Sequence, residues 1–183
     1  MHHNIFCTLT KSFPFEFIFL RYIYFTVTGI SPRILRADMD GKNPLVLANV
    51  SSIRGTTLDI ALDKVNNRLF YSDEGNNMVK YINLTSGVHH AVLYGNPRRP
   101  VGLALFNGTL YWTGEGTVEL FSGGIYKVKA DTLNGGIVRE VVDLLSYPKG
   151  IYAHDARMKI PAGGIFIKKS LAIIIFCNKK KQF

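Results

Sequence analysis

The sequence predicts an all-β protein assembled from repeated four-stranded units. A short apolar strand that carries a tyrosine occurs three times, at Tyr24, Tyr71 and Tyr111. Each copy is followed by a run of alternating apolar and polar residues and then by a second apolar run, which is the pattern of half-buried strands. The last two tyrosines lie about 40 residues apart, and a period of roughly 40–45 residues is typical of one β-propeller blade.

Within a unit we name the strands A to D in chain order. The sequence supplies one partial unit, two full units and one isolated strand. Residues 22–48 provide strands B, C and D, and residues 57–93 and 101–145 each provide A to D. Residues 149–155 provide an A strand, and we expect that no B strand follows it.

Turn residues support these boundaries. Asn107-Gly108 suits a tight turn between strands A and B, because both residues tolerate positive φ angles. Asn66-Asn67 can serve the same purpose in the preceding unit. Pro100 and Pro148 each mark the start of an A strand, since proline cannot donate a hydrogen bond to a sheet.

Together, three segments resemble the low-density lipoprotein receptor class B repeat, also called the YWTD repeat. They are Pro100-Val101-Gly102-Leu103-Ala104, Leu110-Tyr111-Trp112-Thr113 and Met39-Asp40-Gly41, and the resemblance covers roughly residues 22–155. It implies a partial propeller that holds about half of a six-bladed ring. It also implies a structural motif in the B strands, made of Tyr24, Phe25, Thr26, Tyr71, Ser72, Asp73, Tyr111, Trp112 and Thr113.

We align Tyr71 with Tyr111 as the same strand position and expect both to be buried, together with Leu62 and Leu105. In this alignment, Phe70 and Phe25 replace the family's tryptophan in two units and keep an aromatic ring in the core. Trp112 is expected to pack between blades. A partial ring leaves two strand edges unpaired, so we interpret the chain as a fragment of a larger domain.

The family's aspartate after threonine is present in one unit only. It remains as Asp73, but Gly114 and Val27 stand in the other two units. The resemblance implies that this aspartate forms hydrogen bonds to neighbouring backbone. Two units are therefore expected to lack that contact.

Most of the positive charge lies in the two ends of the chain. The net charge is +9, but residues 22–155 contain 13 basic and 12 acidic residues, so a nucleic-acid-binding face is not expected. We separate an N-terminal flank, residues 1–21, and a basic and apolar tail, residues 156–183, from the repeats. Both lack the repeat pattern, and we interpret them as disordered or artefactual sequence without stable contacts to the repeats. The apolar run 171–177 is too short for a membrane span, which needs about 20 residues.

Three glycosylation sequons favour a secretory origin. Asn49, Asn83 and Asn107 each begin an Asn-x-Ser/Thr triplet near an expected turn. Chance is the alternative explanation, because such triplets are common, and a tight hairpin would restrict a sugar at Asn107. Cys7 and Cys177 lie outside the repeats and do not report the redox compartment.

Candidate recognition residues are sparse. Loops carry most contacts of a propeller, and Tyr94, Arg98 and Arg99 are the ligand-loop candidates. A solvated turn is the simpler interpretation of the two arginines. Histidine changes charge between pH 5 and 8, so a pH switch is a hypothesis for His89, His90 and His154, with ordinary surface histidines as the alternative.

The sequence shows no nucleophile motif, metal-ligand set or cofactor fingerprint, and we predict neither catalysis nor a cofactor. Asp38-Met39-Asp40-Gly41 is similar to the start of a calcium loop, but Asn49 stands where an EF-hand requires glutamate. Glu115 and Glu119 fit a solvated loop.

The family resemblance implies a non-catalytic receptor ectodomain that binds an extracellular protein ligand, for endocytosis or for co-receptor signalling, including that of Wnt-type co-receptors. Such a chain would lie on the extracellular face of the plasma membrane or in the secretory pathway. A parent protein would supply the remaining blades and any contact with the membrane. The alternative is a structural matrix propeller of nidogen type. A propeller hydrolase would need acidic or histidine ligands that converge on the axis.

Overall fold

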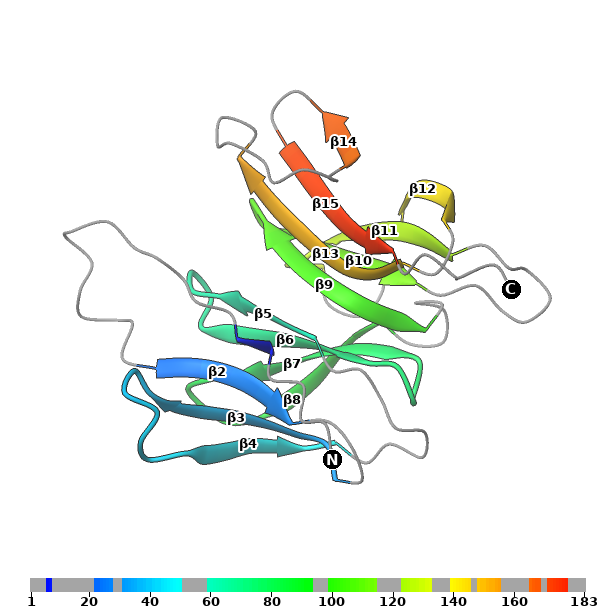
Figure 1. The fold of residues 1–183 in the computed structure, drawn as a ribbon. Coiled ribbons are helices and arrows are strands. Elements are labelled where there is room, and N and C mark those ends of the chain that lie inside the picture. Colours follow the sequence, from blue (N-terminus) through cyan, green and yellow to red (C-terminus); the bar gives the residue numbers. More distant parts are fainter. Residues whose placement is uncertain are drawn as a thin grey trace, which may run out of the picture.

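All regular elements of the computed structural model are β-strands in the residues that it describes. These are residues 6–7, 22–27, 31–50, 59–93, 99–114, 123–132, 139–145, 148–155, 165–168 and 171–177. They contain 15 strands in four antiparallel sheets, which stack one on another through the molecule (Figure 1). The predicted all-β partial propeller is confirmed, and each sheet corresponds to one blade.

The second and third sheets are the two full units, and each is a simple meander. The second sheet has the order β5 (Ile60–Asp63), β6 (Arg68–Asp73), β7 (Met78–Asn83) and β8 (His89–Leu93). The third has the order β9 (Pro100–Phe106), β10 (Thr109–Gly114), β11 (Gly123–Lys129) and β12 (Arg139–Leu145). These strands take the places A to D that the sequence predicts.

The first and fourth sheets include segments from outside the repeats. The first sheet has the order β1 (Phe6–Cys7), β2 (Tyr22–Val27), β3 (Arg33–Asp38) and β4 (Leu45–Asn49). The fourth contains β13 (Pro148–Asp155), β14 (Ile165–Lys168) and β15 (Leu171–Cys177), with β15 in the middle. Strand β1 therefore occupies the A position of the first blade, and β15 occupies the B position of the fourth.

The expectation that residues 149–155 lack a B strand is therefore wrong. Strand β15 pairs antiparallel with β13, from Pro148 opposite Cys177 to Asp155 opposite Leu171. The same pairing, and that of β1 with β2, contradicts the expectation that both ends stay apart from the repeats. The physical reason is the open edge of β13, whose backbone groups need partners, and the β-branched, apolar composition of residues 171–177.

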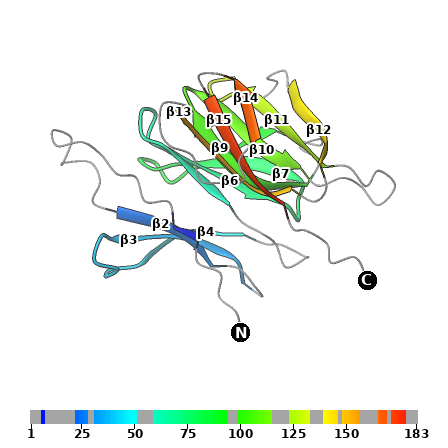
Figure 2. The same ribbon diagram turned by 45° about the horizontal axis from the view of Figure 1, so that its top comes forward.

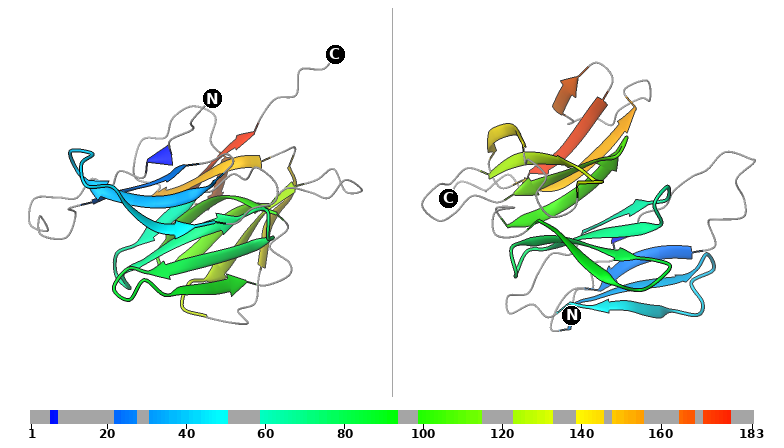
Figure 3. Two further views of the ribbon diagram at one scale, coloured as in Figure 1. Left: turned by 90° about the horizontal axis from the view of Figure 1, so that it is seen from below. Right: turned by 180° about the vertical axis from the view of Figure 1, so that it is seen from behind.

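The sheets follow one another in layers (Figures 2 and 3), and two apolar cores lie between successive sheets. The first core joins the first and second sheets, and the second core joins the second and third. The first is formed by Tyr24, Ile34, Ala48, Val50, Ile60, Leu69, Tyr71 and Ile82. The second is formed by Ala61, Phe70, Val79, Tyr81, Leu103, Leu110, Trp112, Tyr126, Val128 and Ala130. The second sheet is thus buried on both faces.

Strand pairing corrects one position of the sequence alignment. Leu62 pairs with Leu69 and Leu105 pairs with Leu110, so Tyr71 matches Trp112 rather than Tyr111. Tyr71 faces the first core, whereas Phe70 faces the second. A shift of one residue moves a side chain to the other face of a strand, so aligning the two tyrosines mixed the two faces.

It follows that Phe70 occupies the motif's tyrosine position, and that Tyr71, not Phe70, replaces the tryptophan. Tyr71 and Tyr111 are both buried, as expected, while Leu62 and Leu105 are only partly buried at the edges of the cores.

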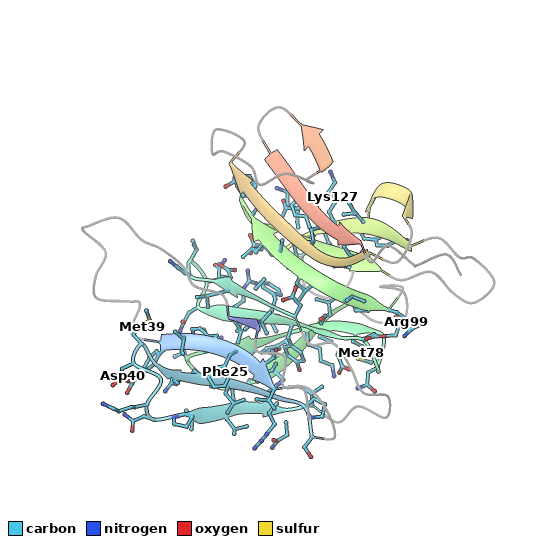
Figure 4. The ribbon with its side chains drawn as sticks, in the orientation of Figure 1. Phe25, Met39, Asp40, Met78, Arg99 and Lys127 are labelled. Carbon is cyan, nitrogen blue, oxygen red and sulfur yellow. The ribbon has the colours of Figure 1, made fainter. Side chains whose placement is uncertain are left out.

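Each sheet has two ends with different connections. At one end, which we call the hairpin end, lie residues 39–44, 64–67, 84–88, 107–108 and 130–132. At the other end, the crossing end, the chain turns between β6 and β7 and passes from one sheet to the next, at residues 59, 74–77 and 99. Figure 4 shows Met39 and Asp40 at the hairpin end on the left, and Met78 and Arg99 at the crossing end on the right. Asn107 and Gly108 both have positive φ, 46° and 64°, as their predicted tight turn requires.

Candidate functional site

The aromatic residues of the motif hold neighbouring blades together. Trp112 has no exposed surface and stacks on Tyr126, with ring centroids 5.7 Å apart. Phe70, equally enclosed, lies 5.6 Å from the ring of Tyr81. In the first blade, Tyr24 points into the first core. These rings fill the cores between sheets, so they act as packing rather than as a ligand surface.

In the second and third blades, the motif hydroxyl joins strand B to the end of strand A, which we call the inner strand. The Oγ of Ser72 accepts a hydrogen bond from the backbone N–H of Asp59 at 2.9 Å, and that of Thr113 accepts one from Gly102 N–H at the same distance. Ser72 also donates its hydroxyl proton to the carbonyl of Val101 in the next blade, at 2.8 Å. Thr26 is fully buried at the matching position of the first blade.

Asp73 organises the turn between β6 and β7. Its carboxylate has no exposed surface and accepts hydrogen bonds from the backbone and side chain of Asn76, and from Lys80 Nζ at 2.9 Å. A buried carboxylate in such a turn needs these donors to offset its loss of hydration. The other two units, with Gly114 and Val27, have no carboxylate there for this contact.

A second contact between blades was missed by the sequence analysis. The carboxylate of Asp59 accepts the backbone N–H of Leu103 on the next blade at 2.8 Å and that of Ile60 at 2.9 Å. Burial raises the pKa of Asp59 to about 6, and the two hydrogen bonds lower it only in part. The available sequence signal is that Asp59 stands where Gly102 stands in the third unit.

Arg68 is the third contact between the second and third blades, and it too was missed. Its side chain is 9% exposed, and the guanidinium donates to Asp63 at 2.7 Å, to Asp131 at 3.0 Å and to the carbonyl of Ala130 at 3.2 Å. Burial raises the pKa of Asp63, but hydrogen bonds from Asn66 and Arg68 outweigh it, so the pKa is lowered. Arg68 therefore links the second and third blades at the hairpin end, and Asp59 and Ser72 link them at the crossing end.

Of the predicted ligand-loop residues, only Arg99 lies within the described residues. Its side chain is 49% exposed, and it forms an ion pair with Glu74 at 2.5 Å. Its backbone N–H donates to Asn77 Oδ1, also at 2.5 Å. Arg99, the residue just before β9, is thus joined to the β6–β7 turn. Tyr94 and Arg98, like Glu115 and Glu119, lie outside the described residues.

The candidate histidines that the structure describes lie at the hairpin end, away from Arg99. His89 and His90 begin β8 at the hairpin end and are exposed. His89 Nδ1 is 3.3 Å from the hydroxyl of Tyr71, and the ring of His90 stacks on Tyr81 at 4.9 Å. The side chain of His154 lies outside the described part. The structure therefore does not bring the histidines to the crossing end with Arg99.

The three sequons occupy different ends. Asn83 and Asn107 are at the hairpin end, while Asn49 ends the outer strand β4 at the crossing end. Asn49 and Asn107 are exposed, and Asn83 is partly buried. The Oδ1 atom of Asn83 accepts the backbone N–H groups of Thr85 and Ser86, which fixes the turn. Ser51, the hydroxyl residue of the Asn49 sequon, lies outside the described residues.

Neither a metal site nor a membrane-spanning helix is found in the described residues. The described residues contain no group of three or more histidine, cysteine, aspartate or glutamate side chains arranged to hold a metal ion. No helix of membrane-spanning length and hydropathy occurs in the part of the chain that the structure describes.

Several known proteins contain segments similar to this chain. It is 35% identical over 85 residues to human low-density lipoprotein receptor-related protein 5, and this match covers 46% of this chain and 5% of that protein. It is 31% identical over 115 residues to the vitellogenin receptor Yl of Drosophila melanogaster, with coverage of 59% and 6%. The protein cueball of Drosophila yakuba is 30% identical over 108 residues, with coverage of 56% and 16%. The chain therefore spans a small part of the length of these relatives.

Solved structures show the same fold at low identity. A chain in the crystal structure of a nidogen/laminin complex superposes with a TM-score of 0.60 and 22% identity, over 72% of this chain and 48% of that one. The streptogramin B lyase structure gives a TM-score of 0.53 and 18% identity, over 72% and 41%. No protein-family model matches the chain. Blade register, motif contacts and receptor relatives agree in supporting low-density lipoprotein receptor class B, or YWTD, repeats in this chain.

Proposed function

We propose that the chain is part of a receptor ectodomain and binds an extracellular protein ligand at the crossing end of its sheets, without catalysis. The observation that carries the proposal is the similarity of the repeats to segments of receptors, such as the vitellogenin receptor Yl. The parent protein would present this surface at the plasma membrane or along the secretory pathway and would supply the further blades. Endocytic uptake and co-receptor signalling, including that of Wnt-type co-receptors, are the finer roles proposed for it.

The crossing end suits recognition because the residue that leads into β9 is held against the β6–β7 turn. Arg99 is joined to that turn through Glu74 and Asn77, so less conformational entropy of this residue is lost on binding. Arg99 remains half exposed and, with Arg98 before it in sequence, offers positive charge to an acidic patch on a ligand. Tyr94 in the same connection is an aromatic candidate for the contact.

The hairpin end is less suitable because two sequons are located there. Glycans on Asn83 and Asn107 would cover that end, since each sugar is bulky and extends from a turn. Asn49 is at the crossing end, but it lies on the outer strand β4, away from the inner strands. We therefore place the ligand at the crossing end near β5, β6 and β9.

Two other proposals are kept. A matrix propeller of nidogen type is supported by the similarity of fold to a chain of the nidogen/laminin complex. A pH switch at His89, His90 and His154 is supported by the stacking of His90 on Tyr81, because a protonated ring would gain cation–π attraction.

Binding experiments with two purified proteins test the main proposal. The full chain is secreted with an added signal peptide, immobilised, and exposed to vitellogenin and to laminin, the partners that the names of its relatives suggest. Wild type is compared with Arg99→Ala and with Lys64→Ala, an exposed cation at the hairpin end. We expect vitellogenin to bind and Arg99→Ala to weaken it by about tenfold, as for loss of a charged contact of roughly 1.4 kcal/mol. Lys64→Ala should bind normally.

Each alternative gives a different result. Binding of laminin alone would favour the matrix proposal. A stronger effect of Lys64→Ala than of Arg99→Ala would move the interface to the hairpin end. Failure of both proteins to bind folded wild-type chain would count against the receptor proposal as stated. Thermal unfolding of each variant checks that its fold is intact.

A further inference from the structure

Asp59 occupies a position that needs no side chain. It precedes Ile60, which pairs with Tyr71, just as Gly102 precedes Leu103, which pairs with Trp112. In the fourth unit, Gly150 stands two residues after the proline that begins β13, as Gly102 does in β9. Two inner strands therefore have glycine at this position. The carboxylate of Asp59 is an addition to the second blade rather than a requirement of the repeat.

This carboxylate joins two blades through backbone groups. Its Oδ2 atom accepts the N–H of Leu103 at 2.8 Å, and the hydroxyl of Ser72 donates to the carbonyl of Val101 at 2.8 Å. Ser72 in turn accepts the backbone N–H of Asp59. Two side chains of the second sheet thus hold two nearby peptide groups of β9, at the crossing end.

The ionic groups near Asp59 are paired with one another. On β6, Asp73 is paired with Lys80, and at the start of β9 Arg99 is paired with Glu74. Arg68 and Asp63 form their own pair at the other end of β5. The sequence of β9 contains no titratable residue. Among the strands packed against β5 and β9, one further titratable side chain is Tyr71 on β6. Strand β13 adds Lys149, Tyr152, His154 and Asp155, and the side chains of these four residues are outside the described part.

Among the described residues, no cation forms an ion pair with Asp59, and a carboxylate that is largely withdrawn from water without one is costly in its ionised form. The two donors of Asp59 are neutral peptide N–H groups, which stabilise a negative charge less than a cation would. A protonated carboxyl keeps its carbonyl oxygen as an acceptor for Leu103 and loses the charge. Burial accordingly raises the pKa of Asp59 to about 6.

We propose that Asp59 makes the joint between the second and third blades proton-dependent, so that the joint is tighter in mildly acidic solution than in neutral solution. The raised pKa in the folded chain means that the folded state binds a proton more readily than the unfolded state, whose aspartate has a pKa of 3.8. This contribution to stability is fully present below pH 3.8 and is lost as pH rises through 6. Acidification within this window strengthens the joint.

The test follows the backbone amide of Leu103 by NMR and the unfolding of the full chain in urea, each between pH 4.5 and pH 7.5. In the wild type, the Leu103 amide shift should titrate with a midpoint near 6, as for the carboxyl that it contacts. The contribution of Asp59 should lower the unfolding equilibrium constant about tenfold from pH 7 to pH 5. In Asp59→Asn, which keeps an acceptor oxygen without the charge, both changes should disappear. At pH 7 this variant should be more stable than the wild type.

Two controls separate Asp59 from other titrating groups. Asp40→Asn removes an exposed carboxyl at the hairpin end, and His154→Asn removes the imidazole of β13, and both should keep the Leu103 transition. Loss of the transition in His154→Asn, its persistence in Asp59→Asn, or a wild-type midpoint near 4 would each overturn the proposal. If Asp59→Asn does not fold, Asp59→Gly, the residue of the other inner strands, takes its place. The wild-type titration of Leu103 decides the question even without either variant.

Discussion

At the scale of single residues, Trp112 has a larger role than the other residues of its strand. It is completely enclosed, belongs to the second core, and stacks on Tyr126. No other tryptophan is present in the sequence. The second and third blades therefore share one large ring whose removal would leave a cavity at their centre.

Trp112→Ala should lower the free energy of unfolding by about 3–5 kcal/mol, as for truncation of a buried aromatic ring. Urea unfolding followed by far-UV circular dichroism measures the change. Val65→Ala is the matched control, because Val65 is 92% exposed and its truncation should cost less than about 0.5 kcal/mol. A change for Trp112→Ala as small as that of the control would show that the blades are not packed as described.

Arg68→Met should cost about 3–5 kcal/mol, because it leaves the carboxylate of Asp63 buried without its cation. The double variant Asp63→Asn with Arg68→Met should recover part of the loss, since the uncompensated charge is then gone. The free energy of unfolding of the single and the double variant is measured at pH 7 and compared with that of the wild type. Additive losses in the double variant would mean that the two side chains do not act as a pair.

Residues of this kind limit what a sequence can reveal. The motif strands were predictable because Leu110-Tyr111-Trp112-Thr113 and its copies repeat. Asp59 and Arg68 were not, because their partners Leu103 and Asp131 belong to the next unit and one of those partners is a backbone amide. The alignment of Tyr71 failed for a related reason: two adjacent aromatic residues make a one-residue slip hard to detect without strand pairing.

At the scale of elements, turns were easier to predict than strand partners. The positive φ angles of Asn107 and Gly108 follow directly from residue type. The pairing of β15 with β13 does not, because β15 comes from a tail without the repeat pattern. Its apolar run is too short for a membrane span, and its β-branched residues form a strand because the edge of β13 is open to pairing. The boundaries at residues 21 and 156 stay a prediction.

Ile174→Pro should weaken the pairing of β15 with β13, because proline lacks the N–H group that a ladder needs and Ile174 lies opposite Tyr152. Hydrogen exchange should then become faster at the β13 amides of Ile151, Tyr152 and Ala153. Ile174→Val is the matched control, since it keeps a β-branched residue with an N–H. Unchanged protection of β13 in the proline variant would show that β15 contributes nothing to that sheet.

At the scale of the whole molecule, the sequons divide between the two ends, and this division can be measured. We expect the chain, secreted from eukaryotic cells, to carry N-glycans at Asn49 and Asn83, and also at Asn107, which is exposed in its turn. Treatment with an N-glycosidase should lower its mass. Each Asn→Gln variant should remove one step of that shift, while Asn43→Gln, outside any sequon, should remove none. An unmodified secreted chain would contradict both the compartment and the shielding of the hairpin end.

The second sheet is buried on both faces, and its motif strand serves both cores through adjacent residues. Phe70 packs toward the third sheet, and Tyr71 packs toward the first. In evolution, we therefore expect a substitution at Phe70 to be compensated among residues of the third sheet, and one at Tyr71 among residues of the first. Two neighbouring codons should then belong to separate co-varying sets. A single-codon deletion between Leu69 and Ser72 would exchange the two sets at once, so selection should tolerate point changes there far better than changes of length.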